Sequence, residues 1–353
     1  MPQTATDAEI NEAAESFISF LKQGKLRNSY DVAYQTVQVL RKVIAHKKWS
    51  TAGDLMNDLK TVGQKMTSAQ PIETTVGNIV RRVLKIIREE YTGDSGNKSE
   101  EGDTEESLHK LLLAQKGSED FSKPSHNLRM TVIDSVNELI TEIESSAYNI
   151  SSQALEHIHS NEIIMTIGKS NTVQGFLKNA GRKRKFSVIV AEGAPFFKGH
   201  ELAKNLAEDG IETTVINDSA VFAIMSRVNK VIIGAHAVMA DGGLRAVNGT
   251  LSVALAAKHH SVPLLVCAAM YKLTPQYVVS YDQDSHNKFM SPHDIVRFSE
   301  GDILAKVHVQ NPVFDYVPPD LVNLFISNIG GNAPSYVYRL LTDVYHPNDT
   351  DLK

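Results

Sequence analysis

Residues 163–193 read IIMTIGKSNTVQGFLKNAGRKRKFSVIVAEG, and this stretch decides the fold of the larger part of the chain. Two short runs rich in β-branched residues, 163–167 and 186–190, flank a segment with helical spacing at 173–179. Strands that alternate with helices indicate βαβ crossovers and a mostly parallel sheet with both faces covered. The alternation continues through further β-branched runs, at 212–216, 231–234 and 262–267. We therefore predict a Rossmann-like α/β domain over residues 156–353.

The preceding residues, 1–155, show a helical pattern instead. Apolar residues recur every three or four positions in five segments, for example at Val76, Val80 and Ile87. Ser50 is the predicted N-cap of the third helix. Residues 92–126 are rich in Gly, Ser and acidic side chains, and their small apolar surface predicts a mobile acidic linker. The prediction is an all-α helical domain that precedes the α/β domain.

The composition narrows the class of protein. The chain has 353 residues, of which 42% are hydrophobic and 22% charged, with a net charge of -5, so there is no basic field for nucleic acid or an anionic membrane. The single cysteine, Cys267, allows neither a disulfide framework nor a thiolate zinc site. No signal peptide and no apolar run of about 20 residues is found. We expect a protein of the cytoplasm, in the cytosol, without metal or cofactor.

Ligands of such sheets lie outside the carboxyl ends of the strands. After the first strand, Lys169 and Ser170 precede a helix, where backbone N–H groups could hold a phosphate. The alternative is an ordinary turn in which Ser170 caps the helix. We favour the turn, because no glycine-rich phosphate motif is present.

Two later strand ends carry further candidates. Glu192 follows the second strand, and His236 and Asp241 follow the fourth. A carboxylate beside an imidazole supports acid–base chemistry where burial tunes both groups. The sequence does not give the distance between them, and we favour a non-catalytic interpretation.

Several motifs carry a specific resemblance. They are MTSAQPIETTVGN at 66–78, QALEHIHS at 153–160, VNKVIIG at 228–234, NPVFDYVPP at 311–319 and FISNIGGNAPSY at 325–336. Together they resemble the alpha/beta/delta family of initiation factor 2B subunits, and its beta branch in particular. The resemblance covers nearly the whole chain and is weakest at the N-terminus and in the acidic linker.

The family also contains sugar-phosphate isomerases, which act on ribose 1,5-bisphosphate and methylthioribose 1-phosphate, and their motifs differ from this chain. Where those enzymes place a cysteine after the first strand, the matching stretch ends in Lys169 and Ser170. His236 stands at the place of their aspartate, and Ala194 at the place of their phosphate-binding arginine. Losing a guanidinium removes bidentate phosphate binding. The resemblance therefore implies a degenerate ligand pocket formed by Lys169, Ser170, Glu192, Ala194 and His236.

The resemblance implies a regulatory role without catalysis. Family members of this kind form the regulatory core of the guanine-nucleotide exchange factor for initiation factor 2, and that core senses phosphorylation of the alpha subunit of the factor. The implied partners are the alpha, delta, gamma and epsilon subunits and initiation factor 2 itself. Two rival functions stay open: a sugar-phosphate isomerase, and a sensor that binds a sugar phosphate without turnover.

Two surfaces are candidates for these partners. The polar face of the fifth long helix carries Thr131, Asp134, Glu138 and Glu142, which we assign to the substrate protein against the alternative of a solvated helix face. The C-terminal stretch is rich in aromatic residues, as buried interfaces are, and we assign it to subunit contact. The alternative is packing within the chain. The residues are Phe314, Tyr316, Phe325, Tyr336 and Tyr338.

Overall fold

The computed structural model describes residues 7–26, 28–94, 121–123, 127–277 and 287–352. The chain divides into two compact units. The helical unit comprises residues 1–71, 79–141 and 344–353, and the α/β unit comprises residues 72–78 and 142–343. The predicted boundary near residue 155 thus differs from this division, which also groups the last ten residues with the helices. Helix α4 extends to Asp94, so residues 92–94 of the predicted linker are helical, and most of the remaining predicted linker lies outside the described residues.

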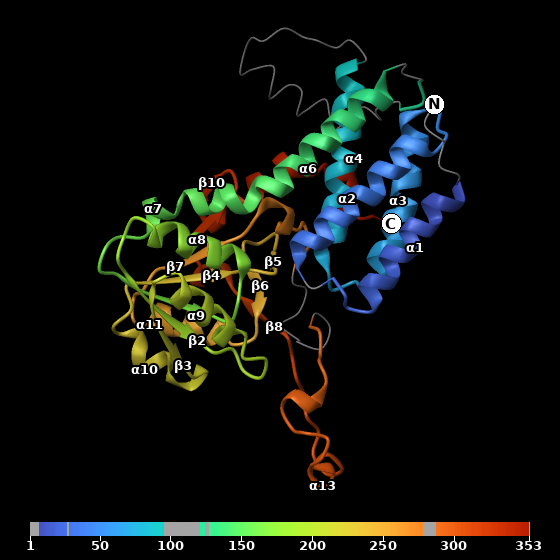
Figure 1. The fold of residues 1–353 in the computed structure, drawn as a ribbon. Coiled ribbons are helices and arrows are strands. Elements are labelled where there is room, and N and C mark those ends of the chain that lie inside the picture. Colours follow the sequence, from blue (N-terminus) through green and yellow to red (C-terminus); the bar gives the residue numbers. More distant parts are fainter. Residues whose placement is uncertain (1–6, 27, 95–120, 124–126, 278–286, 353) are drawn as a thin grey trace. The chain divides into compact units, whose positions relative to one another are not determined.

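Long amphipathic helices build the helical unit (Figure 1). Their apolar stripes meet in a core that includes Leu40, Leu59 and Leu84, none of which is exposed. The predicted N-cap at Ser50 is wrong: Thr51 caps α3, because its Oγ1 accepts a hydrogen bond from Asp54 N at 3.1 Å. The helices are α1 (Asp7–Lys22), α2 (Ser29–His46), α3 (Ala52–Ala69), α4 (Thr74–Asp94) and α6 (Leu128–Ser152), of which α4 begins and α6 ends in residues of the other unit.

A seven-stranded sheet forms the centre of the α/β unit, in the order β10-β9-β7-β4-β1-β2-β3. All neighbours pair in parallel except β10, which is antiparallel to β9. The predicted α/β class is confirmed. The strands are β1 (Ile163–Ile167), β2 (Ser187–Ala191), β3 (Glu212–Ile216), β4 (Lys230–Gly234), β7 (Leu264–Cys267), β9 (Leu324–Ser327) and β10 (Gly330–Asn332).

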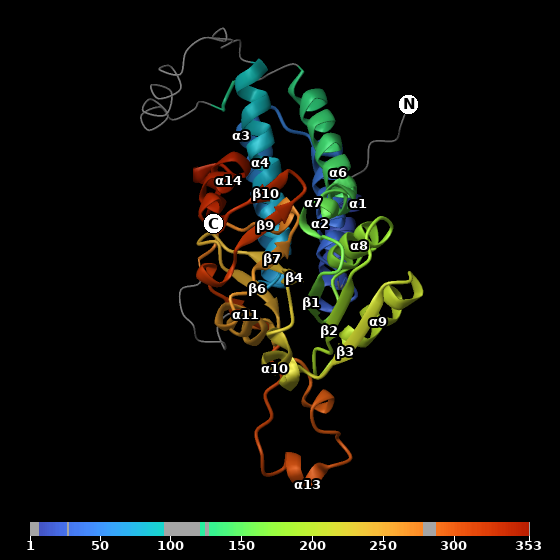
Figure 2. The ribbon, with the colours of Figure 1, turned by 90° about the vertical axis from the view of Figure 1, so that its left-hand side faces the viewer.

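Helices cover both faces of this sheet. Figure 2 shows α8 (Asn171–Gly181) and α9 (Lys198–Glu208) on one side, and α10 (Val221–Met225) and α11 (Thr250–His259) on the other. Side chains of α8 and α9 share one buried cluster with the strands, as expected for a sheet made of crossovers. The cluster includes Phe176, Leu177, Leu202, Leu206, Ile164, Val188 and Ile232.

A second, three-stranded antiparallel sheet was not predicted. It consists of β5 (Ala237–Val238), β6 (Leu244–Val247) and β8 (Phe314–Val317), in the order β5-β6-β8. A tight turn joins β5 to β6, closed by the hydrogen bond from Met239 N to Gly243 O at 2.8 Å. Remaining short helices are α7 (Ala154–His157), α13 (Gly301–Leu304) and α14 (Val337–Val344).

Candidate functional site

The strand order reverses between β1 and β4, and this switch point is where a ligand would lie in such a sheet. Ser170 occupies it. Its Oγ accepts a hydrogen bond from Val173 N at 3.4 Å, so it caps α8. A methyl group built on Gly234, the last residue of β4, would collide with the Ser170 side chain. The strand end is therefore closely filled by the chain itself.

Lys169 and Glu192 of the predicted pocket each contact a different side chain of α9. Lys169 Nζ lies 2.5 Å from Glu201 Oε1 on α9, and this hydrogen bond lowers the pKa of the Glu201 carboxyl. Glu192 Oε2 lies 3.2 Å from His200 Nε2, also on α9. The two predicted residues thus contact two separate partners rather than forming one site.

The loop that follows β2 offers backbone donors, and these are already occupied. Gly193 N and Ala194 N donate to the two carboxylate oxygens of Asp218, at 3.0 and 2.7 Å. A similar arrangement stands at the start of α11, where Gly249 N and Leu251 N donate to Asp315 Oδ2 at 2.8 and 3.1 Å. Both amide sets, which suit an anion, hold a carboxylate of the same chain.

His236 is the predicted pocket residue with a buried partner. Its Nε2 lies 3.3 Å from Oε2 of Glu73, which is 7% exposed and precedes α4. The imidazole also stacks on the ring of Phe314, with 4.5 Å between centroids. Burial opposes ionisation of Glu73, but the charge and hydrogen bond of His236, with the hydrogen bond that Thr75 N donates to Glu73 Oε1, lower the pKa of Glu73 to about 2. Glu73 is therefore a carboxylate at neutral pH.

Two further basic groups face Glu73. Arg245 on β6 is mostly buried; its Nη2 donates to Thr74 Oγ1 at 3.4 Å, and its Cζ lies 5.7 Å from the Phe314 ring centroid. Lys272 Nζ donates to Ala235 O at 2.9 Å. Burial lowers the pKa of Lys272 to about 8, and the charge of Glu73 opposes that shift. We call Glu73, His236, Arg245 and Lys272 the Glu73 cluster.

The Glu73 cluster surrounds one carboxylate with three basic side chains. Among the residues that the structure describes, Arg245 Nε and the nearby side-chain oxygens of Thr75 and Asn78 are buried without a hydrogen-bond partner. Cys267 adds no nucleophile, because burial raises the pKa of its thiol to about 12. The cluster can hold and neutralise charge, and it presents neither a thiolate nor a protonated carboxyl.

The sequence interpretation missed Glu73, Arg245 and Lys272. Lys272 follows the apolar strand β7 at the carboxyl edge of the sheet, which is the one local signal that could have marked it. Glu73 lies far away in the sequence, on a segment that was assigned to the helical domain. Only the folded chain brings it to His236.

The predicted polar face of α6 is partly engaged. Asp134 and Glu138 are exposed. Thr131 is half-buried, and its Oγ1 donates to Leu128 O at 3.1 Å. Glu142, also half-buried, accepts a hydrogen bond from Asn328 Nδ2 at 3.2 Å. Asp134 and Glu138 are the two members that stand open to a partner.

The predicted tail aromatics separate into two groups. Phe325 is 4% exposed in β9, Phe314 stacks on His236, and Tyr316 donates its hydroxyl to Asp241 Oδ2 at 2.5 Å. Tyr336 and Tyr338 are 41% and 69% exposed. Three members of the set thus pack within the chain, and two are available at its surface.

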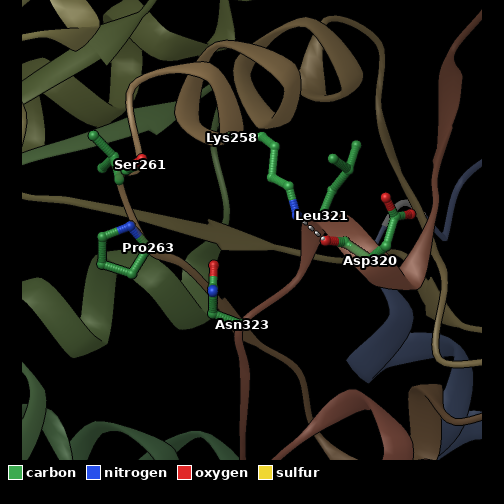
Figure 3. A pocket seen from close by; sticks show the side chains of 7 residues that line it. Lys258, Ser261, Pro263, Asp320, Leu321 and Asn323 are labelled. Carbon is green, nitrogen blue, oxygen red and sulfur yellow. Dashed lines mark hydrogen bonds between the residues drawn. The ribbon is translucent and has the colours of Figure 1, made fainter.

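A pocket of about 330 Å³ lies at the opposite, amino-terminal edge of the sheet (Figure 3). Lys258 and Asp320 stand on its rim, and Lys258 Nζ donates to Asp320 O at 3.3 Å. None of the predicted site residues lines it. The lining residues are Lys258, Ser261, Val262, Pro263, Asp320, Leu321 and Asn323.

Two kinds of site find no support in the described part of the chain. Within residues 7–26, 28–94, 121–123, 127–277 and 287–352, no three His, Cys, Asp or Glu side chains gather as a set that could hold a metal ion. No helix among those residues combines the length and apolar character that crossing a bilayer requires.

Comparison with known proteins identifies the family. The chain is 46% identical to translation initiation factor eIF2B subunit beta of Dictyostelium discoideum, over 95% of each chain. It is 32% identical to ribose 1,5-bisphosphate isomerase of Archaeoglobus fulgidus, over 61% of this chain and 68% of the relative. The structure resembles a chain of the tetrameric eIF2B-beta2-delta2 complex from Chaetomium thermophilum, with a TM-score of 0.72, 28% identity and 95% coverage of both chains.

The match to a family extends over most of the sequence. The model of the initiation factor 2 subunit family matches residues 25–334, which include the strands of both sheets. The motifs at 66–78, 228–234 and 311–319 fall within this range. The chain therefore belongs to the initiation factor 2 subunit family.

Proposed function

We propose that the chain is a beta-type subunit of eIF2B, the guanine-nucleotide exchange factor for translation initiation factor 2, and that it acts as a regulatory component of this assembly. The observation that carries the proposal is the 46% identity to an eIF2B beta subunit over 95% of both chains. The likeness to a beta2-delta2 complex supports other eIF2B subunits as its partners.

The proposal includes the absence of isomerase activity, although one relative is named an isomerase. Ala194 offers no guanidinium for phosphate, and its N–H donates to Asp218. His236 faces Glu73, and the one cysteine is a buried thiol. These contacts support a strand edge that satisfies its own charges rather than those of a sugar phosphate.

We also propose which partners the chain contacts. The delta, alpha, gamma and epsilon subunits would contact the chain, with Tyr336 and Tyr338 as exposed aromatic anchors. Initiation factor 2, through its alpha subunit, would meet Asp134 and Glu138 on α6. We propose no direct contact of the chain with nucleic acid or membrane. Its location in the cytosol stays a prediction.

Co-expression with a delta-type subunit tests the proposal. The tagged chain and the delta subunit should elute together, and addition of the remaining subunits should restore nucleotide exchange on initiation factor 2. A chain that is stable and monodisperse by itself and captures none of the subunits would contradict it. Production of ketose from ribose 1,5-bisphosphate by the purified chain would favour the isomerase instead.

A further inference from the structure

Residues 290–310, MSPHDIVRFSEGDILAKVHVQ, form an arm that lies between β7 and β8 along the chain. All of these residues are described. In Figure 1 and Figure 2 this orange segment projects away from both sheets of its unit, with α13 at its far end. We call it the α13 arm.

The base of the α13 arm is clamped. Met290 N donates to Asn311 O at 2.9 Å, and Val313 N donates to Lys288 O at 2.9 Å, as in an antiparallel pair. Asn287 adds a second clamp, because its side chain donates to Phe314 O at 2.6 Å and accepts from Phe314 N at 2.9 Å. The arm therefore starts and ends at a fixed place beside β8.

Local hydrogen bonds also give the arm a defined shape. Ile295 N donates to Pro292 O at 3.0 Å, and Ala305 N donates to Gly301 O at 2.9 Å, so the arm contains two closed turns, the second of them in α13. Phe298 N donates to His293 Nδ1 at 3.2 Å, and the two rings lie 4.8 Å apart. These contacts order the backbone without covering the large side chains.

No residue of the α13 arm is buried, although the arm is rich in apolar residues. Each such side chain would gain about 1.5–3 kcal/mol from full burial, so an uncovered group of them marks a contact surface rather than a solvated loop. Five are well exposed: Met290 at 41%, Ile295 at 49%, Phe298 at 61%, Ile303 at 45% and Val307 at 53%.

The charges of the arm indicate the class of partner. Asp294, Glu300 and Asp302 oppose Arg297 and Lys306, so neither sign dominates. Nucleic acid and anionic membranes attract a basic surface, which the arm lacks. An apolar strip between charges of both signs suits the surface of a folded protein, with an apolar centre and a polar rim.

We propose that the α13 arm docks on an apolar surface of a delta-type subunit and anchors the chain in its assembly. The inference rests on the proposed function and extends it, because it names the segment that makes the contact. The delta subunit is the partner named for a solved relative that covers 95% of this chain. Ile295, Phe298 and Ile303 would provide the buried centre of the contact.

Binding of two arm variants to a purified delta-type subunit tests the inference. The first combines Ile295→Ser, Phe298→Ser and Ile303→Ser, and the second replaces residues 292–309 by a short Gly-Ser linker and keeps both clamps at the base. Each should weaken binding at least about tenfold, since a few central apolar anchors carry most of the energy of an interface. Tyr148→Ser on α6, where Tyr148 is 73% exposed, is the matched control and should bind as the unchanged chain does.

The outcomes separate the inference from the function on which it rests. If the unsubstituted chain binds delta and both arm variants bind it with an affinity within about twofold, the role of the arm is overturned and the proposed function stays intact. Unchanged chain that fails to bind delta overturns both. An arm variant that alters only the self-association of the chain, in sedimentation without delta, also contradicts the inference. Equal melting temperatures for all variants would show that lost binding is not lost folding.

Discussion

The carboxylate of Glu73 lies 3.3 Å from Nε2 of His236, so a residue at the start of α4 supplies the counter-charge at the carboxyl end of a sheet strand. Arg245 and Lys272 share this carboxylate. In open α/β sheets, ligands lie outside the carboxyl ends of the strands. Here the chain places its own charges there, and the first predictions concern what those charges contribute to stability.

Replacing Glu73 by Gln should lower the free energy of unfolding by about 3 kcal/mol at pH 7, because a buried basic group left without its counter-charge is costly. Urea unfolding of the purified chain measures this. Glu144→Gln, an exposed position on α6, is the control and should change the free energy by less than about 0.5 kcal/mol. If Glu73→Gln were as stable as Glu144→Gln, water would already solvate the basic groups of the Glu73 cluster, and the prediction would be wrong.

The contribution of Glu73 should depend on pH in the acid range. Its folded pKa of about 2 lies below the ordinary value of 4.5, so the unfolded chain takes up the proton first as the pH falls. The stabilisation is therefore complete above about pH 5 and is lost between 4.5 and 2. The stability difference between the unchanged chain and Glu73→Gln should be constant from pH 5 to 7 and shrink below pH 4.5. A difference that grows on acidification would contradict the assignment.

Lys272 should make stability depend on pH in the alkaline range. Burial lowers its pKa from 10.5 to about 8, so between these values the unfolded chain binds the extra proton and stability rises with pH. Lys272→Met should lack this rise and, at pH 7, be as stable as the unchanged chain or up to about 3 kcal/mol more stable. Unfolding curves at pH 7, 9 and 10 decide it, with the exposed Lys204→Met as control. If the free energy of unfolding changed with pH in the same way for Lys272→Met and the unsubstituted chain, Lys272 would not be the cause of the rise.

In the helical unit, the C-terminal segment depends on Asp349. This fully buried carboxylate accepts two hydrogen bonds from Arg88, at 2.8 and 3.1 Å, and lies 3.0 Å from Lys60 Nζ. Asp349→Ala should lower the free energy of unfolding by about 3–5 kcal/mol, because it removes a carboxylate that neutralises the buried guanidinium of Arg88. Thermal unfolding should show a clear drop for this variant and none for Asp351→Ala, which changes an exposed carboxylate two residues away.

The proposed contact of α6 with initiation factor 2 predicts an effect of charge reversal. The double variant Asp134→Lys, Glu138→Lys should weaken binding of the factor about tenfold. Reversing charges at the rim of an interface chiefly slows association. Binding of the phosphorylated and unphosphorylated factor to the assembled complex measures it, with Glu144→Lys on the same helix as control. Unchanged affinity for both forms would exclude this face.

Much of the fold followed from local patterns. The β-branched runs at 163–167 and 212–216 coincide with β1 and β3, and the helical segment 173–179 lies within α8, because periodicity reports which face of an element is buried. The sheet of β5, β6 and β8 did not follow. Its strands have two to four residues, too few for a period to show, and they pair across a long chain excursion.

The sequence by itself determined the two-part architecture, the parallel sheet and the family, because these depend on apolar spacing and on motifs within short windows. Only the tertiary structure decided which groups meet. It paired Lys169 with Glu201 and His236 with Glu73, and it left the apolar residues of the α13 arm uncovered. The physical reason is that electrostatic and packing partners are set by distances in space. Crossovers of the chain set those distances, and the local spacing of apolar residues does not specify them.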